Sequence, residues 1–312
     1  MTGIIYLLLG ITILYFSGEY LVNGSVSLAK HLKVQPFVIA VTLVAFGTSA
    51  PELAISINSA IKGFQGITLG NIVGSNIANV LFAVPLAYLI RISKNCDVNK
   101  KDNLFLLIIT MIFCCLVLYK TKFGIIYGVI SLTILIGYIF LIIFETKIGK
   151  RKYNLENEDI KEISLFKSFF FSLIGIIGVV VGAEVLVHGA VITAELLGIS
   201  QVVIGLTIVA LGTSLPEVAA SMVAAYRGQI NFILGAILGS NLFNILGITG
   251  TASILAPINT QDTLTFIDLL FLALSTLVFI MFSIFSKFLN KKLLTAILIS
   301  YIIYVLFLFL SF

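Results

Sequence analysis

The sequence predicts an all-α integral membrane protein with ten transmembrane helices, arranged as two inverted repeats of five helices. Hydrophobic residues make up 60% of the 312 residues and charged residues only 11%, with a mean hydropathy of +1.17. Soluble chains carry roughly 25% charged residues, so this composition argues against a soluble enzyme, a nucleic-acid-binding protein or a disordered chain. The chain also divides into ten apolar stretches, and its two halves resemble each other.

The ten spans follow from the requirement that a transmembrane helix has about 20 consecutive, mostly apolar residues. Short connections separate them, except at 146–163, which has the composition of a solvated loop. We therefore expect a first repeat at 1–145, a cytoplasmic loop at 146–163 and a second repeat at 164–312. The expected helices cover residues 3–29, 36–61, 66–90, 103–119, 124–145, 164–193, 201–226, 230–255, 266–286 and 293–311.

The basic residues predict on which side of the membrane each connection lies. With ten helices, alternate connections fall on opposite sides of the membrane. Lys62, Lys120 and Lys122 then lie on one side, and the other sixteen of the 19 Lys and Arg residues lie opposite them. Because cytoplasmic loops carry the excess of basic residues, the larger set is cytoplasmic and both termini face outward.

An internal repeat appears when the sequence is shifted by 165 residues. Residues 17–81 then face 182–246 without a gap, and 29 of these 65 positions are identical. The shift spans five helices, an odd number, so the two copies cross the membrane in opposite directions. Inverted repeats with interrupted helices at matching positions indicate a secondary transporter whose site lies near the membrane midplane.

Each copy carries the motif Gly-Thr-Ser-x-Pro-Glu, and the first copy ends at Glu52. Pro51 has no N–H and its ring clashes with the preceding turn, so we expect the helix to break and to free a backbone carbonyl there. Thr48 and Ser49 lie four and three residues before Glu52, on the same helix face. A carboxylate, two hydroxyls and freed carbonyls are thus expected together. The second copy repeats the set with Thr213, Ser214, Pro216 and Glu217.

The helix after each motif adds a Ser and an Asn four residues apart, again on one face: Ser75 with Asn79, and Ser240 with Asn244. The combined set offers only oxygen atoms, which suit hard cations such as Ca²⁺ and Na⁺. Two carboxylates balance one Ca²⁺, and the same oxygens suit several Na⁺ ions. Small residues expected to allow close packing of these helices are Gly66, Gly70, Gly74, Gly235 and Gly239.

Two further carboxylates, Glu19 and Glu184, occupy matching positions inside the first helix of each repeat. No Lys or Arg is expected at a similar depth to pair with the four intramembrane Glu residues, so a bound cation or a proton is the expected countercharge. For Glu19 and Glu184 themselves, ion ligation, gating and hydrogen bonding to Asn or Ser in helix packing remain open. His188, which faces Asn23 in the repeat, is expected to be a lone packed histidine.

The two motif blocks resemble the α-repeats of the sodium/calcium exchanger family within the Ca²⁺/cation antiporters. The blocks read GTSAPE with GNIVGSNIAN, and GTSLPE with GAILGSNLFN. The resemblance implies a core of the second, third, seventh and eighth helices, across which the first and sixth helices slide to alternate access. It also implies electrogenic exchange of Ca²⁺ and Na⁺ at overlapping sites, with Glu52 and Glu217 as shared Ca²⁺ ligands. The ligands carried over are Thr48, Ser49, Glu52, Ser75, Asn79, Thr213, Ser214, Glu217, Ser240, Asn244 and the carbonyls of Ala45 and Ala210.

Three departures from the family pattern bear on ion specificity. Asn244 stands where some relatives, including K⁺-dependent exchangers, carry Asp, so one negative charge is missing and K⁺ co-transport is disfavoured. Ala236 stands opposite Asn71 in the repeat, so the halves differ there. Ca²⁺/H⁺ exchangers of the wider superfamily carry an acidic motif with a different sequence. The motif Gly-Thr-Ser-x-Pro-Glu therefore favours Na⁺ as the driving ion.

Alternatives to Na⁺/Ca²⁺ exchange stay open at this point. Ca²⁺/H⁺ exchange would use Glu52 and Glu217 as proton carriers, and a cation channel would line a pore with the same oxygens. An intramembrane enzyme with Ser49 or Ser214 as nucleophile lacks a His or Lys placed as a base. We therefore expect a multi-pass protein of the cell membrane that transports Ca²⁺ and Na⁺, without enzyme activity or a cofactor. Its expected partners are the lipid bilayer and the two ions, with no nucleic acid and no obligate protein partner.

Overall fold

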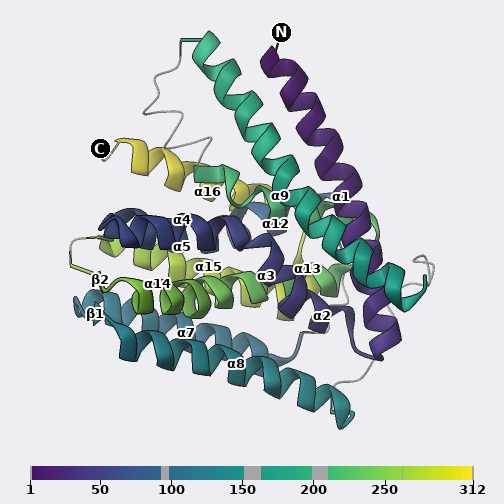
Figure 1. Ribbon diagram of the computed structural model, residues 1–312, viewed down its shortest axis with the longest axis horizontal. Coiled ribbons are helices and arrows are strands. Elements are labelled where there is room, and N and C mark those ends of the chain that lie inside the picture. Colours follow the sequence, from purple (N-terminus) through teal and green to yellow (C-terminus); the bar gives the residue numbers. More distant parts are fainter. Residues whose placement is uncertain (1, 93–97, 151–162, 199–209, 262, 311–312) are drawn as a thin grey trace.

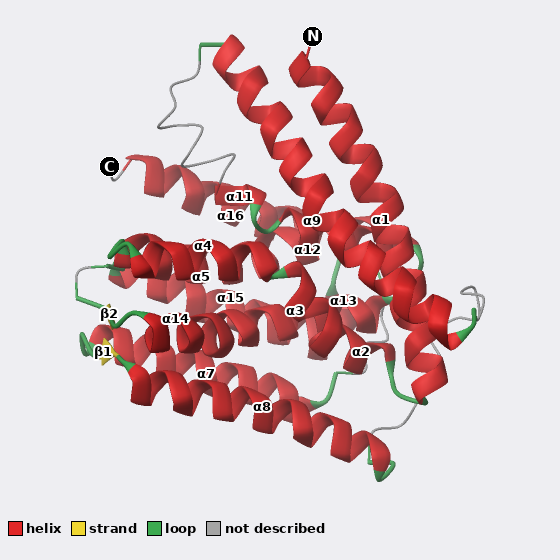
Figure 2. Cartoon of the chain, in the orientation of Figure 1, coloured by secondary structure: helices red, strands yellow, loops and turns green. Residues whose placement is uncertain are grey.

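The computed structural model describes residues 2–92, 98–150, 163–198, 210–261 and 263–310. Within these ranges the chain is nearly all helical (Figure 2). Eight of the described helices are long and apolar enough to cross a membrane, or nine if one bent pair counts as a single span. The predicted helical membrane protein is thus confirmed. The remaining expected helix, 201–226, starts outside the described residues, so the count of ten, the inverted repeat and the orientation of the termini stay predictions.

The helices begin and end within a few residues of the expected positions. Most expected spans are continuous helices, and the others consist of consecutive shorter elements. In chain order the helical elements are α1 (Thr2–Leu32), α2 (Pro36–Ile39), η1 (Ala40–Val44), α3 (Ala45–Thr48), α4 (Ala50–Ile61), α5 (Gln65–Ala78), η2 (Asn79–Ala83), α6 (Val84–Ile90), α7 (Lys100–Leu118), α8 (Ile125–Lys147), α9 (Leu165–Leu196), α11 (Ala210–Gly212), α12 (Leu215–Tyr226), α13 (Ile230–Leu242), η4 (Phe243–Ile248), α14 (Thr249–Leu255), α15 (Phe266–Ile284), η5 (Ser286–Phe288) and α16 (Lys291–Leu310).

The helix that carries the first motif is broken where Pro51 predicts it. Ser49, with φ −85° and ψ 12°, separates α3 from α4, and the two arms of this span are bent by 47°. Ser214 has almost the same backbone angles, φ −86° and ψ 0°, between α11 and α12. Each Pro lies in the first turn of the new helix, where its missing N–H costs no helical hydrogen bond. The break in the first repeat is confirmed, and the second motif has the same local geometry.

Within the described residues, three short π-helical turns interrupt the helices of the two motif blocks. One of them, η1, precedes α3, while η2 begins at Asn79 and η4 contains Asn244. A π-helical turn inserts one extra residue per turn and is frequent at functional sites. The turns therefore widen two helices at the amides that the sequence marks as candidate ligands.

The longest helices, α1 and α9, lie side by side and run antiparallel, and they cross the other helices at a steep angle (Figure 1). A small residue recurs every seven positions on both helices, and it allows their backbones to approach closely. A Cβ atom at Gly10 would lie 2.6 Å from the Leu186 nitrogen, and one at Gly175 would lie 2.4 Å from the Leu21 nitrogen. The small residues are Gly3, Gly10, Ser17 and Gly24 on α1, and Ser168, Gly175, Gly182 and Gly189 on α9.

Helix α13 lies at the centre of the molecule, and all of its residues are buried. A Cβ atom at Gly235 would lie 2.7 Å from the Phe37 oxygen, and one at Gly239 would lie 2.5 Å from the Val41 oxygen. The predicted close packing is thus confirmed for these two glycines. For Gly70 and its neighbours on α5, the predicted close packing is not tested. The residues that they would contact are 202 and 206, the counterparts of Phe37 and Val41, and both lie outside the described residues.

Two contacts extend the likeness between the halves beyond the segment aligned by sequence. The Tyr138 hydroxyl of α8 donates to Asp102 of α7 at 3.1 Å, and the Tyr304 hydroxyl of α16 donates to Asp268 of α15 at 2.9 Å. In both pairs the partners are 36 residues apart and the Asp lies in the first turn of its helix, where a carboxylate is favourable. The fourth and fifth expected helices of each half are therefore tied together in the same way.

The described chain also contains a small antiparallel strand pair that was not predicted. Strands β1 (Lys122–Phe123) and β2 (Ile258–Asn259) pair with Lys122 opposite Asn259 (Figure 1). They join the α7–α8 connection to the α14–α15 connection. These two connections are expected on the same, outward side of the membrane, which agrees with the alternation of the spans.

Candidate cation site

The predicted ligands converge from both halves at the helix breaks and the π-helical turns. All ten side chains are at most 8% exposed. The two Glu residues lie in the first turns of α4 and α12, where the helix N-terminus favours a negative charge. The side chains are Thr48, Ser49, Glu52, Ser75 and Asn79 from the first half and Thr213, Ser214, Glu217, Ser240 and Asn244 from the second.

Glu217 accepts hydrogen bonds from both halves of the molecule. The Ser49 hydroxyl donates to Glu217 Oε1 at 2.9 Å, although the two residues are 168 positions apart. The Ser240 hydroxyl of α13 donates to the same oxygen at 3.3 Å. One carboxylate oxygen thus holds the first broken helix against α12 and α13.

Glu52 faces the same interior from the other half. Ser75 and Thr213 approach its carboxyl, although the Thr213 hydroxyl completes no hydrogen bond. The Glu52 and Glu217 carboxyls lie close enough to interact electrostatically. No Lys or Arg of the described chain forms an ion pair with either. Two buried like charges without a basic partner require a cation or protons for compensation.

Several buried oxygen atoms at this place have no hydrogen-bond partner among the described residues. Buried polar atoms are nearly always hydrogen-bonded, so a group of unpartnered acceptors at one place indicates a ligand site. Oxygen atoms are the donors that Ca²⁺ and Na⁺ prefer, and this cluster contains neither nitrogen nor sulfur donors. The unpartnered atoms among the predicted ligands are Glu52 Oε2, Glu217 Oε2, Asn79 Oδ1, Asn244 Oδ1, Thr213 Oγ1 and Ser214 Oγ.

The amide nitrogens of Asn79 and Asn244 are bonded across the two halves. Asn79 Nδ2 donates to Asn241 Oδ1 at 3.1 Å, and Asn244 Nδ2 donates to Asn76 Oδ1 at 2.9 Å. Asn76 and Asn241 in turn donate to each other's backbone carbonyls at 3.3 and 3.5 Å. The four bonds form two pairs that the repeat relates. A shift of 165 residues turns the Asn79–Asn241 bond into the Asn244–Asn76 bond, and it exchanges the two bonds to the backbone carbonyls. Asn76 and Asn241 face each other in the sequence repeat, but no role was predicted for either residue.

The backbone carbonyl of Ala45, a ligand that the family resemblance implies, keeps its helical hydrogen bond at the break. It accepts the Ser49 amide at 3.1 Å and the Thr48 hydroxyl at 3.5 Å. The helical bond that Pro51 cannot make is the one to the Gly47 carbonyl, two residues after Ala45, so the bond to the Ala45 carbonyl is kept. Ala210, its counterpart, is the first residue of α11.

The difference between Asn71 and Ala236 also has a structural explanation. Asn71 Nδ2 donates to the Glu52 backbone oxygen at 3.2 Å and to Ser56 Oγ at 2.9 Å. This amide ties α5 to the helix that carries Glu52. Ala236 leaves that tie absent in the second half, where α13 is buried on all sides.

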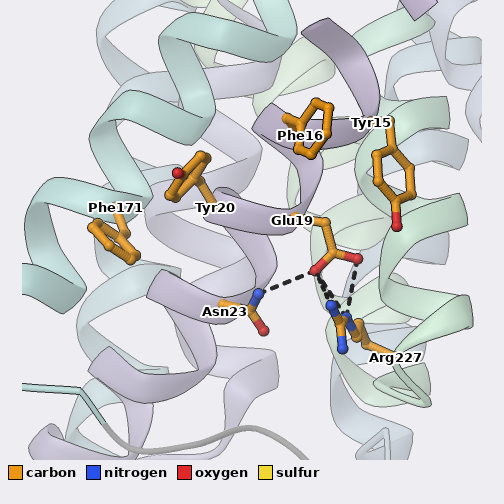
Figure 3. A pocket seen from close by; sticks show the side chains of 7 residues that line it. All are labelled: Tyr15, Phe16, Glu19, Tyr20, Asn23, Phe171 and Arg227. Carbon is orange, nitrogen blue, oxygen red and sulfur yellow. Dashed lines mark hydrogen bonds and ion pairs between the residues drawn. The ribbon is translucent and has the colours of Figure 1, made fainter. Parts of the chain in front are cut away.

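Glu19 has a basic partner, which corrects the expectation that none of the four intramembrane Glu residues would have one. Arg227 forms an ion pair with Glu19, donating through Nε at 3.0 and 2.8 Å and also through Nη2. The Asn23 amide donates to Glu19 at 3.1 Å. Arg227 follows the last residue of α12, and its long side chain reaches back to α1. This pair lines a cavity of about 300 Å³ with Tyr15, Phe16, Tyr20 and Phe171 (Figure 3).

The residues that match Glu19 and Arg227 in the repeat are not paired with each other. Glu184 on α9 matches Glu19 of the first half, and Lys62 at the end of α4 matches Arg227 of the second half. Both are exposed, and neither forms an ion pair with a described residue. His188, the counterpart of Asn23, packs edge-on against Tyr6 with ring centroids 5.0 Å apart. The predicted packing histidine is thus at the α1–α9 contact.

The fold and the candidate site together point to a class of protein, the multi-pass membrane transporters of cations. Residues 2–144 and 167–312 match the family model described as sodium/calcium exchanger protein. The chain belongs to the sodium/calcium exchanger family, and the resemblance seen in the two motif blocks is confirmed. The family consists of transporters and not of enzymes, so this protein is a cation antiporter of the membrane.

Relatives of similar length occur in archaea and bacteria. The chain is 35% identical to the uncharacterized membrane protein MJ0091 of Methanocaldococcus jannaschii over 91% of each chain. It is 32% identical to the sodium/calcium exchanger MaX1 of Methanosarcina acetivorans over 89% of this chain and 90% of the relative. Identity to the putative antiporter CaxA of Alkalimonas amylolytica is 33%, with 82% of each chain covered.

Solved structures of the sodium–calcium exchanger NCX_Mj have the same fold as this chain. NCX_Mj soaked with zero Na⁺ and Ca²⁺ gives a TM-score of 0.82 at 32% identity, covering 98% of this chain and 99% of that one. NCX_Mj soaked with 10 mM Na⁺ and 10 mM Sr²⁺ gives a TM-score of 0.78, covering 97% of each chain. The likeness therefore extends over nearly the whole chain.

Proposed function

We propose that this protein exchanges Na⁺ for Ca²⁺ across the cell membrane, electrogenically and by alternating access. The observation that supports this most strongly is the cluster of unpartnered buried oxygens around Glu52 and Glu217. Two carboxylates balance one Ca²⁺, and when Ca²⁺ leaves they need Na⁺ ions in its place. Because both ions use the same carboxylates, neither is held while the other is bound, which couples their movements.

The ligand roles follow from the local geometry. Glu52 and Glu217 supply the charges, and the hydroxyls and amide oxygens around them replace the hydration shell of the ion. The hydroxyls of Ser49 and Ser240 donate to Glu217 in this state. When the cation binds, each hydroxyl rotates so that a lone pair of its oxygen faces the cation. For the Ala45 carbonyl to join, the Thr48 hydroxyl has to release it. The Ala210 carbonyl is the proposed equivalent in the second half.

The unequal contacts of α1 and α9 support alternating access between two inverted repeats at 1–145 and 164–312. The helix α1 packs along α12, and the Glu19–Arg227 ion pair closes this contact. The matching helices α9 and α4 have no comparable contact within the described residues, and Glu184 and Lys62 stay apart. Exchanging the roles of the repeats therefore gives a second state in which Glu184 pairs with Lys62.

The distribution of basic residues supports an outward-facing assignment of this state. Arg227 belongs to the large basic set, which we place at the cytoplasm together with the 146–163 loop. The closed contact thus lies inside, and the open one, at Lys62, lies outside. The NCX_Mj structures that resemble this chain come from work on extracellular ion exchange.

The proposed function is tested by Ca²⁺ uptake into vesicles that contain the purified protein. Na⁺, H⁺ and K⁺ gradients are imposed one at a time, with the membrane voltage clamped by an ionophore. We expect uptake to follow an outward Na⁺ gradient and to respond to voltage. Uptake that follows an imposed pH gradient and ignores an opposed Na⁺ gradient would establish Ca²⁺/H⁺ exchange instead. Flux that needs no counter-ion would establish a channel.

A further inference from the structure

The two amides at the centre of the molecule, Asn76 and Asn241, are not among the proposed ligands, yet both are buried. They are 1% and 2% exposed and lie where α5 and α13 cross. We propose that they are positioning residues that fix the side-chain amides of Asn244 and Asn79 with the oxygen atoms directed to the cation. The inference rests on the proposed function, because it assigns a part of the same ion site.

The first step concerns the orientation of the two central amides. Asn76 Nδ2 donates to the Asn241 backbone oxygen, and Asn241 Nδ2 donates to the Asn76 backbone oxygen. An amide group has its nitrogen and its oxygen on opposite sides. With each nitrogen held by a backbone carbonyl, each Oδ1 is left to act as an acceptor. Neither central amide turns over without losing its bond to the backbone.

The second step passes this orientation to the proposed ligands. Asn76 Oδ1 accepts from Asn244 Nδ2 at 2.9 Å, and Asn241 Oδ1 accepts from Asn79 Nδ2 at 3.1 Å. Both ligand nitrogens are thereby held away from the ion site. The oxygens of Asn79 and Asn244 remain buried without a hydrogen-bond partner.

The third step is the direction of those free oxygens. Asn244 lies four residues after Ser240, whose hydroxyl donates to Glu217. Asn79 lies four residues after Ser75, whose hydroxyl approaches Glu52. Residues four apart share a helix face, so both amides are on the side of the carboxylates. A reversed amide would present N–H groups there, which bind the carboxylates themselves and repel a cation.

The two asparagines of each Gly-Ser-Asn-x-x-Asn block therefore have different proposed roles. The last Asn of the block is a proposed ligand in its own half, and the first Asn orients the ligand of the opposite half. Each half therefore controls the ligand geometry of the other. Removing a positioning amide is expected to weaken cation binding while the carboxylates and the fold remain.

The test measures binding of radioactive Ca²⁺ to the purified protein at equilibrium, which does not require exchange. Asn76→Leu and Asn241→Leu keep the volume and remove the hydrogen bonds. We expect each to raise the apparent dissociation constant of Ca²⁺ about tenfold, the order expected when a buried hydrogen bond is lost. Asn103→Leu is the matched control. It removes a buried amide that bonds Ser283 between α7 and α15, and its Ca²⁺ binding should equal that of the wild type.

A double-mutant cycle separates positioning from a general structural effect. In an Asn244→Ala background there is no amide left to orient, so adding Asn76→Leu should change the dissociation constant by less than about twofold. A second weakening of about tenfold in that background would overturn the proposal, as would equal effects of Asn103→Leu and Asn76→Leu. If Asn76→Leu does not fold, the Asn241→Leu and Asn79→Ala cycle decides the question from the other half.

Failure of this inference is distinguishable from failure of the proposed function. A wild-type protein that binds Ca²⁺ but moves it without Na⁺ refutes the proposed exchange and leaves the amide cycle to be judged by binding. Conversely, Na⁺-driven Ca²⁺ uptake combined with fully additive Asn76 and Asn244 effects keeps the proposed function and rejects the positioning role.

Discussion

The two halves of the molecule are alike at their centre and unlike at their edges. At the centre, the amide bonds of Asn76 and Asn79 have counterparts in those of Asn241 and Asn244, almost bond for bond. At the edges, Glu19 is paired with Arg227 while the matching Glu184 and Lys62 are exposed and apart.

The difference between the halves reaches the ion site itself. Ser49 donates to Glu217, whereas the hydroxyl of its counterpart Ser214 has no hydrogen-bond partner among the described residues. Under the proposed alternating access, such differences between the halves mark one of two related states. We therefore expect the central amides to keep the site intact in both proposed states, and the outer ion pairs to select the state.

The largest expected effect comes from neutralising either carboxylate of the site. Glu52→Gln and Glu217→Gln should each reduce Na⁺-dependent Ca²⁺ uptake at least about a hundredfold, because a buried charge compensated by the ion is lost. Vesicle uptake and size-exclusion chromatography check activity and folding. Glu195→Gln, which alters an exposed acid at the end of α9, serves as the control and should transport normally. Substantial transport by either site variant would contradict the assignment.

The next largest effect concerns Asn244, the amide that stands, by the family resemblance, where K⁺-dependent exchangers carry Asp. Asn244→Asp adds a negative charge, so we expect the ratio of Na⁺ to K⁺ dependence to change by about tenfold, while the melting temperature changes little. Uptake measured in paired Na⁺ and K⁺ gradients gives the ratio. An unchanged ratio would show that the charge at this position does not determine the Na⁺ and K⁺ dependence. Asn79→Asp, the same change in the other half, shows whether the two positions are equivalent.

A smaller effect is expected when the outer ion pair is broken. Glu19 and Arg227 are 12% and 37% exposed in their side chains, so their pair is worth about 1 kcal/mol, or about a fivefold shift between states. Arg227→Glu should increase the inward-facing population, measured by the accessibility of a reporter cysteine from each side. Swapping both charges, Glu19→Arg with Arg227→Glu, should restore the balance.

The matching variant of the other half gives the opposite sign. Lys62→Glu weakens the pair that we assign to the second state, so it should favour the present, outward-facing state. If both variants shift accessibility in the same direction, the two ion pairs do not alternate.

The last prediction concerns stability and not transport, and it compares the packing at the centre with the packing at the periphery. A Cβ atom at Gly239 would lie 2.5 Å from the Val41 oxygen, so Gly239→Ala should destabilise the protein by about 1–3 kcal/mol. No described atom lies within 4 Å of a Cβ built at Gly137 of α8, so Gly137→Ala should be neutral. Thermal unfolding in detergent compares the two, and equal stabilities would show that α13 is less tightly packed than described.

The sequence predicted the spans and the principal site residues because the signals involved are local. Apolar length gives the helices, and the proline of each motif marks a break, as Ser49 confirms at the first one. The scarcity of charge draws attention to Glu52 and Glu217, which the fold brings together. The ligand assignment itself remains a prediction that the binding experiments address.

Other features depend on geometry that a linear sequence does not contain. Arg227 was assigned to a loop because it follows the apolar run of α12, whereas its side chain reaches back to Glu19. The roles of Asn76 and Asn241 depend on the crossing of α5 and α13. The π-helical turns at Asn79 and Asn244 have no sequence period of their own.

The central claim is that Ca²⁺ and Na⁺ compete for one cluster of oxygens around Glu52 and Glu217. It is tested most directly by equilibrium Ca²⁺ binding to the purified protein at increasing Na⁺ concentration, with K⁺ replacing Na⁺ at constant ionic strength. We predict that Na⁺ raises the apparent dissociation constant of Ca²⁺ without reducing the number of sites, and that Glu52→Gln abolishes this binding. Ca²⁺ that stays bound at saturating Na⁺, or binding that survives in Glu52→Gln, would contradict the account.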